Sequence, residues 1–277
     1  MTPEEQETQQ KNAYQQTFET VADKYGTGAC GFFHTSGEVM AGLHKLQGHE
    51  HILDVASGTG AAAIPLAHQL PNGKVTAVDF SASMLEHAKT RATNEQLNNM
   101  IFHIHDMTEM PFSDRQFDHA NCAFGLFFVE DMVSLLSHIT SKIKTGGNVM
   151  ISSFCGDSFM PAGELLFNRL RQYGLDIPET PTGWKRIAEP EKLHVLFSDA
   201  GLTEVMITPK SLGYYTTPEG WWEVIWNAGF RGLVAQLGDK LENFKREHLE
   251  EVTSLMDKNG LWLEVDVNFT QGVKERA

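Results

Sequence analysis

The sequence predicts an α/β protein built on a doubly wound, mostly parallel sheet of seven strands. Two observations carry this prediction. From residue 51 onward, apolar strand-like runs alternate with helical stripes, and turns rich in glycine or proline separate them. In addition, the first strand leads directly into a glycine turn and an alanine-rich helix. Such alternation produces a parallel sheet with helices on both faces.

The segments before the sheet are expected to be mainly helical. Residues 1–12 are polar and are expected to fray, and apolar residues then recur at helical spacing from Tyr14 to Tyr25. A second helix is expected over 37–47. Between them, residues 26–34 are rich in glycine and aromatic side chains and are expected to form a loop that closes over a ligand.

The strands and helices of the sheet region follow in order. The first strand begins at His51 and the other six are expected over 74–79, 100–105, 117–124, 147–154, 203–208 and 261–270. Helices are expected over 63–70, from a capping box at Ser83 and Glu86, around 133–139 and over 191–200. Inserted helices are expected over 161–174, from Thr217 onward and over about 239–257, the last docked on the sheet.

The chain is interpreted as a single domain over 1–277, because 277 residues suffice for one large core with insertions. An N-terminal helical cap is expected over about 13–47. The sheet core is expected over about 50–155, 190–208 and 261–272, with helical lid insertions over about 156–189 and 214–259.

Composition narrows the possible partners and compartment. The formal net charge is −14, and no basic cluster is present, which disfavours nucleic acid as a partner. Three widely spaced cysteines without a C-x-x-C motif predict a reducing compartment and no zinc site. The N-terminus lacks the pattern of a signal peptide and no apolar run is long enough to span a membrane, so a cytoplasmic location is expected.

The turn after the first strand predicts a nucleotide-like ligand. Gly58 and Gly60 permit a tight turn and a close approach of a ligand to the backbone, and Ala61 to Ala63 open a helix beside it. Together with Ala63, these glycines also match the weak G-x-G-x-x-[GA] dinucleotide fingerprint. Asp54 argues against a dinucleotide, because a carboxylate at the strand tip repels a pyrophosphate and attracts a cationic cofactor. S-adenosylmethionine fits this description.

Residues 53–60, Leu-Asp-Val-Ala-Ser-Gly-Thr-Gly, resemble the first motif of class I S-adenosylmethionine-dependent methyltransferases. That motif usually has glycine where this chain has Ala56, so the backbone at Ala56 is expected to avoid the conformations that only glycine reaches easily. The runs 106–118, 123–126 and 144–147 are similar to the ubiquinone/menaquinone-biosynthesis C-methyltransferases and their small-molecule relatives. The resemblance covers 14–155 and implies the Rossmann-like methyltransferase fold and its cofactor, while the quinone substrate does not transfer.

The cofactor site is expected at the carboxyl ends of the strands. Asp79 ends the second strand, where its carboxylate can accept from both ribose hydroxyls. Asp106 follows the third strand, where it can accept from the adenine amino group, with Met107 against the ring. The predicted cofactor-binding residues are Asp54, Ala56, Ser57, Gly58, Gly60, Asp79, Phe80, Met84, Asp106, Met107 and Phe124.

A substrate pocket is expected from aromatic side chains, because small-molecule pockets are mostly apolar. An aromatic stripe at helical spacing is also typical of simple packing. The predicted pocket residues are Tyr25, Phe33, Phe127, Trp222 and Trp226.

Methyl transfer is an in-line displacement at a sulfonium carbon, so few residues need to act chemically. His34 is the predicted catalytic base, with His119 and Tyr25 as alternatives. No metal site is expected.

The sequence thus predicts a methyltransferase that moves a methyl group from S-adenosylmethionine to a small aromatic or amphipathic acceptor and releases S-adenosylhomocysteine. The acceptor atom is left open, as is the choice between monomer and homodimer. The alternatives are a non-catalytic binding protein with this fold and a protein methyltransferase, and an NAD-dependent oxidoreductase is disfavoured by Asp54.

Overall fold

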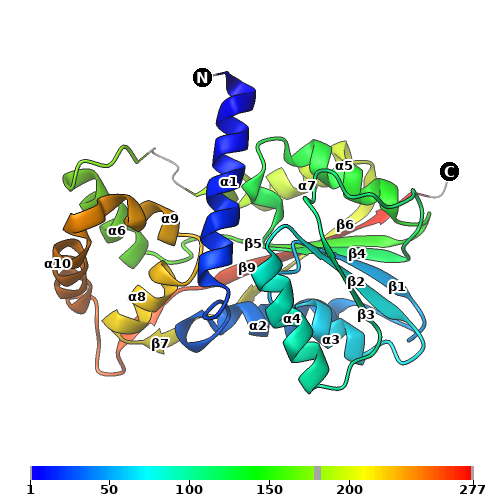
Figure 1. The fold of residues 1–277 in the computed structure, drawn as a ribbon, viewed down its shortest axis with the longest axis horizontal. Helices are drawn as coiled ribbons and strands as arrows, with labels where there is room; N and C mark the ends of the chain where they lie inside the picture. Colours follow the sequence, from blue (N-terminus) through cyan, green and yellow to red (C-terminus); the bar gives the residue numbers. More distant parts are fainter. Residues whose placement is uncertain (1, 178–181, 276–277) are drawn as a thin grey trace. The chain divides into compact units, whose positions relative to one another are not determined.

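The computed structural model describes residues 2–177 and 182–275. The contacts within the chain define two compact units. Unit 1 comprises Met1–Phe32, Asp157–Pro181 and Leu212–Val265, and unit 2 comprises Phe33–Gly156, Thr182–Ser211 and Asp266–Ala277. Figure 1 labels the elements of both units. The interpretation of residues 1–277 as a single domain stays a prediction.

Unit 2 contains the large sheet. Its strands are β1 (His51–Val55), β2 (Lys74–Asp79), β3 (Met100–Ile104), β4 (His119–Ala123), β5 (Asn148–Phe154), β6 (Leu202–Ser211) and β9 (Asp266–Lys274). They are arranged in the order β3-β2-β1-β4-β5-β9-β6. β1 to β5 pair in parallel, while β9 is antiparallel to both β5 and β6. The prediction of a mostly parallel seven-stranded sheet is confirmed.

Helices cover both faces of this sheet (Figure 1). Those of unit 2 are α2 (Phe32–Leu43), which begins at the last residue of unit 1, α3 (Ala63–His68), α4 (Ala82–Asn94), α5 (Met132–Lys142) and α7 (Pro190–Asp199), with the 3₁₀ turns η2 (Leu126–Phe128) and η3 (Gly183–Ile187). One buried core joins α2, α3 and α4 to the inner strands and includes Ala41, Leu66, Leu85, Ile52 and Val75. Strands buried on both faces need continuous apolar runs, which β1 and β2 have.

Two sequence expectations in unit 2 are wrong in detail. Helix α4 is capped by Ser81, whose hydroxyl accepts from the amide of Met84 at 3.2 Å, and not by Ser83. The seventh strand of the sheet is 266–274 and not 261–270. Residues 261–263 instead form β8, which pairs with β7 in unit 1.

Unit 1 is mainly helical. Its elements are α1 (Pro3–Val21), the 3₁₀ turn η1 (Gly28–Cys30), α6 (Ala162–Gln172), β7 (Tyr214–Thr216), α8 (Pro218–Trp226), α9 (Arg231–Val234), η4 (Ala235–Lys240), α10 (Leu241–Thr253) and β8 (Leu261–Leu263). The expected frayed segment 1–12 is wrong for the described residues, because α1 begins at Pro3. Thr2 and Glu5 form a capping box there, which satisfies two backbone amides at the helix start.

The expected loop over 26–34 is also partly wrong. Only its first part is a turn, and α2 already begins at Phe32, so Phe33 and His34 lie on a helix. Because a helix fixes the direction of each side chain, Phe33 and His34 occupy defined positions in unit 2.

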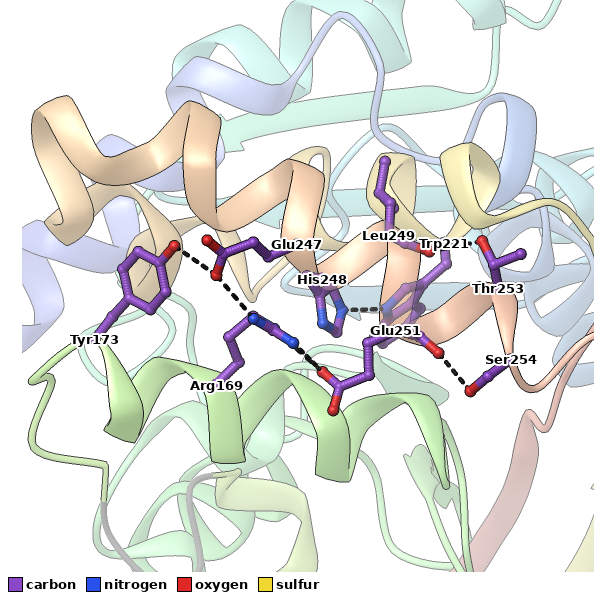
Figure 2. Close-up of polar contacts among 9 residues, drawn as sticks. All are labelled: Arg169, Tyr173, Trp221, Glu247, His248, Leu249, Glu251, Thr253 and Ser254. Atoms are coloured by element: carbon purple, nitrogen blue, oxygen red, sulfur yellow. Dashed lines mark hydrogen bonds and ion pairs between the residues drawn. The ribbon is translucent and has the colours of Figure 1, made fainter.

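Helix α10 packs on α6 and α8 instead of docking on the sheet, which corrects the expectation for 239–257. Arg169 on α6 donates to both Glu247 and Glu251 on α10, at 2.9 Å from Nη1 and 2.7 Å from Nη2 (Figure 2). Tyr173 donates its hydroxyl to the same Glu247 at 2.8 Å. One guanidinium that reaches two carboxylates one turn apart fixes the register of the two helices. Among the residues that the structure describes, no helix combines the length and the apolar character needed to cross a membrane.

Candidate functional site

The loop that follows β1 is a tight turn held by its own backbone. The amide of Ser57 donates to the carbonyl of Val78 on β2, and the amide of Gly60 donates to the carbonyl of Ser57, each at 2.9 Å. Gly58 and Gly60 have φ values of +54° and +80°, in the left-handed region that favours glycine. Nothing lies within 4 Å of the position that a Cβ on Gly58 would take, so this side of the loop is open.

Ala56 also adopts a left-handed conformation, with φ +53°. The expectation that it avoids the region favoured by glycine is therefore wrong. The turns after β1 and β4 meet at this point, since a Cβ placed on Gly125 would lie 2.6 Å from the Cβ of Ala56. The left-handed conformation costs an L-residue roughly 1–2 kcal/mol, and the surrounding structure supplies it.

Asp79 ends β2 and holds the glycine loop in place. Its Oδ2 accepts from the amide of Gly58 at 2.8 Å, and its Oδ1 accepts from the amide of Ser81 at 2.9 Å. Asp79 thus places a carboxylate at the end of β2 and orders the loop through its two oxygens. The sequence predicted a ligand role for Asp79 and did not anticipate these backbone contacts.

Asp54 is a buried carboxyl beneath this loop. It is 1% exposed, and neither of its oxygens has a hydrogen-bond partner among the described residues. Burial raises the pKa of Asp54 to about 7; the nearby Ser57 hydroxyl opposes this rise, and the charge of Asp79 adds to it by a smaller amount. Asn121 lies opposite Asp54 on β4, and its Nδ2 also has no partner among the described residues. The sequence interpretation missed Asn121. This edge of the sheet thus holds a buried, chargeable acceptor with no cation from the described part of the chain beside it.

The remaining predicted cofactor residues lie around the ends of β2 and β3. Asp106 follows β3, and its Oδ1 accepts from both the amide and the hydroxyl of Thr108 at 2.8 Å. Met107 and Phe80 are half-buried, while Met84 on α4 is buried. These residues all belong to unit 2, and the structure places them after neighbouring strands, as expected for an open parallel sheet.

An aromatic cluster lies at the ends of β4 and β5. Phe124 has φ +52° and stacks on Phe154 with ring centroids 4.5 Å apart. Phe33 on α2 meets the edge of Phe124 at 5.3 Å, and Phe127 and Trp184 flank Phe154 at 6.5 and 5.9 Å. The sequence predicted Phe33, Phe124 and Phe127 as site residues. It missed Phe154 and Trp184, because no local spacing connects β5 with residue 184.

The other predicted pocket residues belong to unit 1. Tyr25 meets Phe18 edge to face at 6.0 Å. Trp222 and Trp226 stack on each other at 6.1 Å, with Arg231 over Trp226 at 4.0 Å and Lys245 over Trp222 at 5.3 Å. These cation–π contacts satisfy the two indole faces within unit 1. The pocket role of Tyr25, Trp222 and Trp226 stays a prediction.

The histidine candidates have contrasting surroundings. His34 Nε2 lies 2.9 Å from Nη1 of Arg91, and burial together with Arg91 lowers the pKa of His34 to about 4. His119 lies at the beginning of β4, so it is at the opposite edge of the sheet from the strand ends, and its Nδ1 accepts from the amide of Asn148 at 3.0 Å. The role of His34 as catalytic base stays a prediction.

The residues at the strand ends fit S-adenosylmethionine. The open side of Gly58 leaves room against the backbone, and Asp79 places a carboxylate beside it, the type of group that accepts from ribose hydroxyls. The buried Asp54 has unpartnered oxygens that suit a cationic ligand, since a buried carboxylate without a counter-charge is unfavourable. A pyrophosphate would bring two further negative charges to the same place. In the described ranges, no group of three or more His, Cys, Asp or Glu side chains is arranged to hold a metal.

Comparison with known proteins agrees with this geometry. Residues 52–147 match the family model described as a methyltransferase domain. A demethylmenaquinone methyltransferase of Listeria monocytogenes is 30% identical over 139 residues, which cover 49% of this chain and 57% of that protein. The ubiquinone/menaquinone biosynthesis C-methyltransferase UbiE of Bdellovibrio bacteriovorus is 30% identical over 155 residues, which cover 54% of this chain and 65% of that protein. The chain therefore spans less than two thirds of the length of either relative.

Solved structures share the fold. The phosphoethanolamine N-methyltransferase 2 of Haemonchus contortus, in complex with S-adenosyl-L-methionine, aligns with a TM-score of 0.55 and 16% identity, covering 94% of this chain and 60% of that one. Residues 52–147 thus match a methyltransferase domain, on a fold shared with methyltransferases of solved structure. The chain resembles the UbiE and demethylmenaquinone methyltransferases. The predicted resemblance and the predicted fold are confirmed, and the predicted cofactor agrees with the matched domain.

Proposed function

We propose that this protein transfers a methyl group from S-adenosylmethionine to a small organic acceptor with an aromatic or amphipathic character. The observation that supports S-adenosylmethionine as the methyl donor is the pair of carboxylates at the ends of β1 and β2. Asp54 is buried and unpartnered, and Asp79 orders the open glycine loop. An aromatic cluster supports an aromatic or amphipathic methyl acceptor, because flat apolar walls suit a ring-bearing ligand. The cluster consists of Phe33, Phe124, Phe127, Phe154 and Trp184.

The protein's contribution to this reaction is alignment and exclusion of water. Bound S-adenosylmethionine supplies an electrophilic methyl group on sulfur. Asp79 would accept from the ribose hydroxyls, Asp106 would accept from the adenine amino group, and Asp54 would provide the negative charge that favours a cation. The buried aromatic side chains keep water from the reacting atoms, which strengthens these electrostatic contacts.

The relatives supply a first acceptor to try. They are named for methylation in menaquinone and ubiquinone biosynthesis, and a demethylated quinol has the flat ring that the aromatic cluster suits. A protein that binds a partner without methyl transfer is the second candidate, and a protein methyltransferase is the third. The retained Asp54, Gly58 and Asp79 favour an enzyme over the second. A cytoplasmic location, a monomeric or homodimeric state and the absence of a nucleic-acid partner belong to the same proposal.

Two measurements test the proposal. Calorimetry with S-adenosylmethionine should show binding, whereas a protein that only binds a partner should release no heat. Incubation with methyl-labelled donor and either a demethylated quinol or a metabolite extract should then place the label in a small molecule, detected by mass spectrometry. Label found only in protein would favour protein methylation, the absence of donor binding would favour the non-catalytic alternative, and donor binding without any transfer would contradict the proposed acceptor class.

A further inference from the structure

Arg91 joins three parts of unit 2 that surround the proposed donor site. It lies in the last turn of α4 and is half-buried. Its Nη1 lies 2.9 Å from Nε2 of His34 on α2 and 2.9 Å from the carbonyl oxygen of Thr59 in the glycine loop. A single guanidinium nitrogen therefore connects one helix to the loop and to a second helix.

The chemistry of arginine fixes the roles in this contact. A guanidinium has only donors, so Nε2 of His34 is the acceptor and the ring proton of neutral His34 resides on Nδ1. The lone pair on Nε2 is therefore occupied. Burial and the positive charge of Arg91 lower the pKa of His34 to about 4, in agreement with a neutral ring that accepts from Arg91.

The second contact acts where the backbone is least constrained. Thr59 stands between Gly58 and Gly60, both left-handed, so the peptide on either side of Thr59 has freedom that other residues lack. Donation from Arg91 fixes the direction of the Thr59 carbonyl. Helix α2 touches the end of the same loop, because a Cβ on Gly37, one turn after His34, would lie 2.0 Å from the carbonyl oxygen of Ala61. Helix α2 and the loop are thus assembled as one piece.

We propose that Arg91 is a positioning residue that holds the glycine loop in the shape that binds the donor, with His34 as its neutral acceptor and not as a catalytic base. This inference rests on the proposed function, because it requires that the donor binds at this loop. Arg91 supports the loop at a different backbone group from Asp79: Asp79 fixes the amide of Gly58, and Arg91 fixes the carbonyl of Thr59.

Calorimetry with S-adenosylmethionine and S-adenosylhomocysteine tests the role of Arg91. Arg91→Gln should weaken the binding of both ligands by about ten-fold, the loss expected for hydrogen bonds from a charged donor. The rate at saturating donor should change much less, because Arg91 does not face the reacting atoms. Lys89→Gln, on the same helix and paired with exposed Glu86 at 3.6 Å, is the matched control and should leave affinity unchanged.

Binding by the wild type together with equal binding by Arg91→Gln would overturn the inference, while no binding by the wild type would overturn the proposed function instead. If Arg91→Gln does not fold, Arg91→Lys replaces it, and an affinity equal to that of the wild type would again refute the role. His34 supplies the second arm. His34→Ala should lose donor affinity, and His34→Gln, which keeps an acceptor but is no base, should recover most of it.

The rate distinguishes this role from that of a catalytic base. If His34 were the base, His34→Gln would bind donor but lose the chemical step, and the pH dependence of the rate would lose a limb. The positioning role predicts that His34→Gln keeps most of the rate at saturating donor. Hydrogen exchange adds a readout independent of turnover: Arg91→Gln should speed amide exchange at residues 58–60, and Lys89→Gln should not.

Discussion

The indole Nε1 of Trp221 donates a hydrogen bond to Nε2 of His248 across 2.9 Å in the interior of unit 1 (Figure 2). Because indole is only a donor, His248 must accept at Nε2 and carry its proton on Nδ1. Nδ1 has no partner among the described residues, and both side chains are fully buried. Burial, with a smaller contribution from Arg169, lowers the pKa of His248 to about 4.

This contact predicts a loss of stability in mild acid. An unfolded histidine has a pKa near 6.5, so between pH 6.5 and 4 the unfolded state binds a proton that folded His248 does not. The contribution of neutral His248 to the free energy of unfolding is complete above pH 6.5. It is lost as the pH falls from 6.5 to 4, by about 3 kcal/mol at most. Denaturant unfolding followed by tryptophan fluorescence at several pH values from 7.5 to 4 measures this slope.

The matching variants separate His248 from the other histidines. His248→Gln keeps an acceptor for Trp221 and does not titrate, so its stability should fall less steeply between pH 6.5 and 4 than that of the wild type. His194→Gln, at an exposed position on α7, should keep the steeper slope of the wild type. Identical slopes for the wild type and His248→Gln would refute the assignment.

The parts of the fold that local patterns determine are the parts that the sequence predicted. β1 and β2 are buried on both faces, and their continuous apolar runs indicated them directly. The end of the last strand could not be found this way. Residues 261–274 form one strand-like run, and only the pairing of 261–263 with β7 divides it into two strands in different units.

Within the site, the same distinction holds. Asp54 and Asp79 were predictable because each ends an apolar strand at a known edge of a parallel sheet. The contact between His34 and Arg91 joins residues 57 positions apart and has no local signal. Ala56 adopts a left-handed backbone that the conformational preference of alanine does not indicate, so propensity alone gave the wrong expectation.

Asp54 predicts a donor affinity that depends on pH. Its pKa of about 7 means that the ligand-free carboxyl takes up a proton as the pH falls below 7 and then no longer attracts a cation. The affinity for S-adenosylmethionine should therefore fall by about ten-fold between pH 8 and pH 6. Asp54→Asn should bind weakly at both values, and Asp199→Asn, at an exposed site on α7, should keep the dependence of the wild type.

The same substitution should stabilise the ligand-free protein. Between pH 3.8 and 7 folded Asp54 retains a proton that the unfolded chain has lost, so stability declines as the pH rises through this window. At pH 8 the ionised, buried carboxylate destabilises the folded state. Asp54→Asn removes this charge and should raise the free energy of unfolding by on the order of 2 kcal/mol. A less stable Asp54→Asn at pH 8 would show that the carboxylate has a partner in the ligand-free state.

Asp79 predicts a loss of binding that is specific to the ribose. Asp79→Ala should weaken the binding of S-adenosylhomocysteine by more than ten-fold, roughly 1.5–3 kcal/mol, because hydrogen bonds to a charged acceptor are lost. The variant also loses the acceptor for the amides of Gly58 and Ser81, so reduced affinity alone does not identify the cause. The ligand analogue without both ribose hydroxyls resolves this: the wild type should discriminate between the two ligands and Asp79→Ala should not. Equal discrimination by both proteins would refute the ribose assignment.

Gly58 predicts a separation of binding from stability. An alanine there must adopt φ +54°, which costs about 1 kcal/mol, and its methyl group meets no atom of the protein within 4 Å. If the donor occupies that open side, Gly58→Ala should lower the melting temperature by only a few degrees and reduce donor affinity far more than ten-fold. Gly201→Ala is the matched control, since Gly201 has φ +77° with equally open surroundings but lies between α7 and the beginning of β6, at the opposite edge of the sheet from the carboxyl ends of β1 and β2. It should show a similar loss of stability with unchanged donor binding, and an unchanged affinity in Gly58→Ala would place the donor elsewhere.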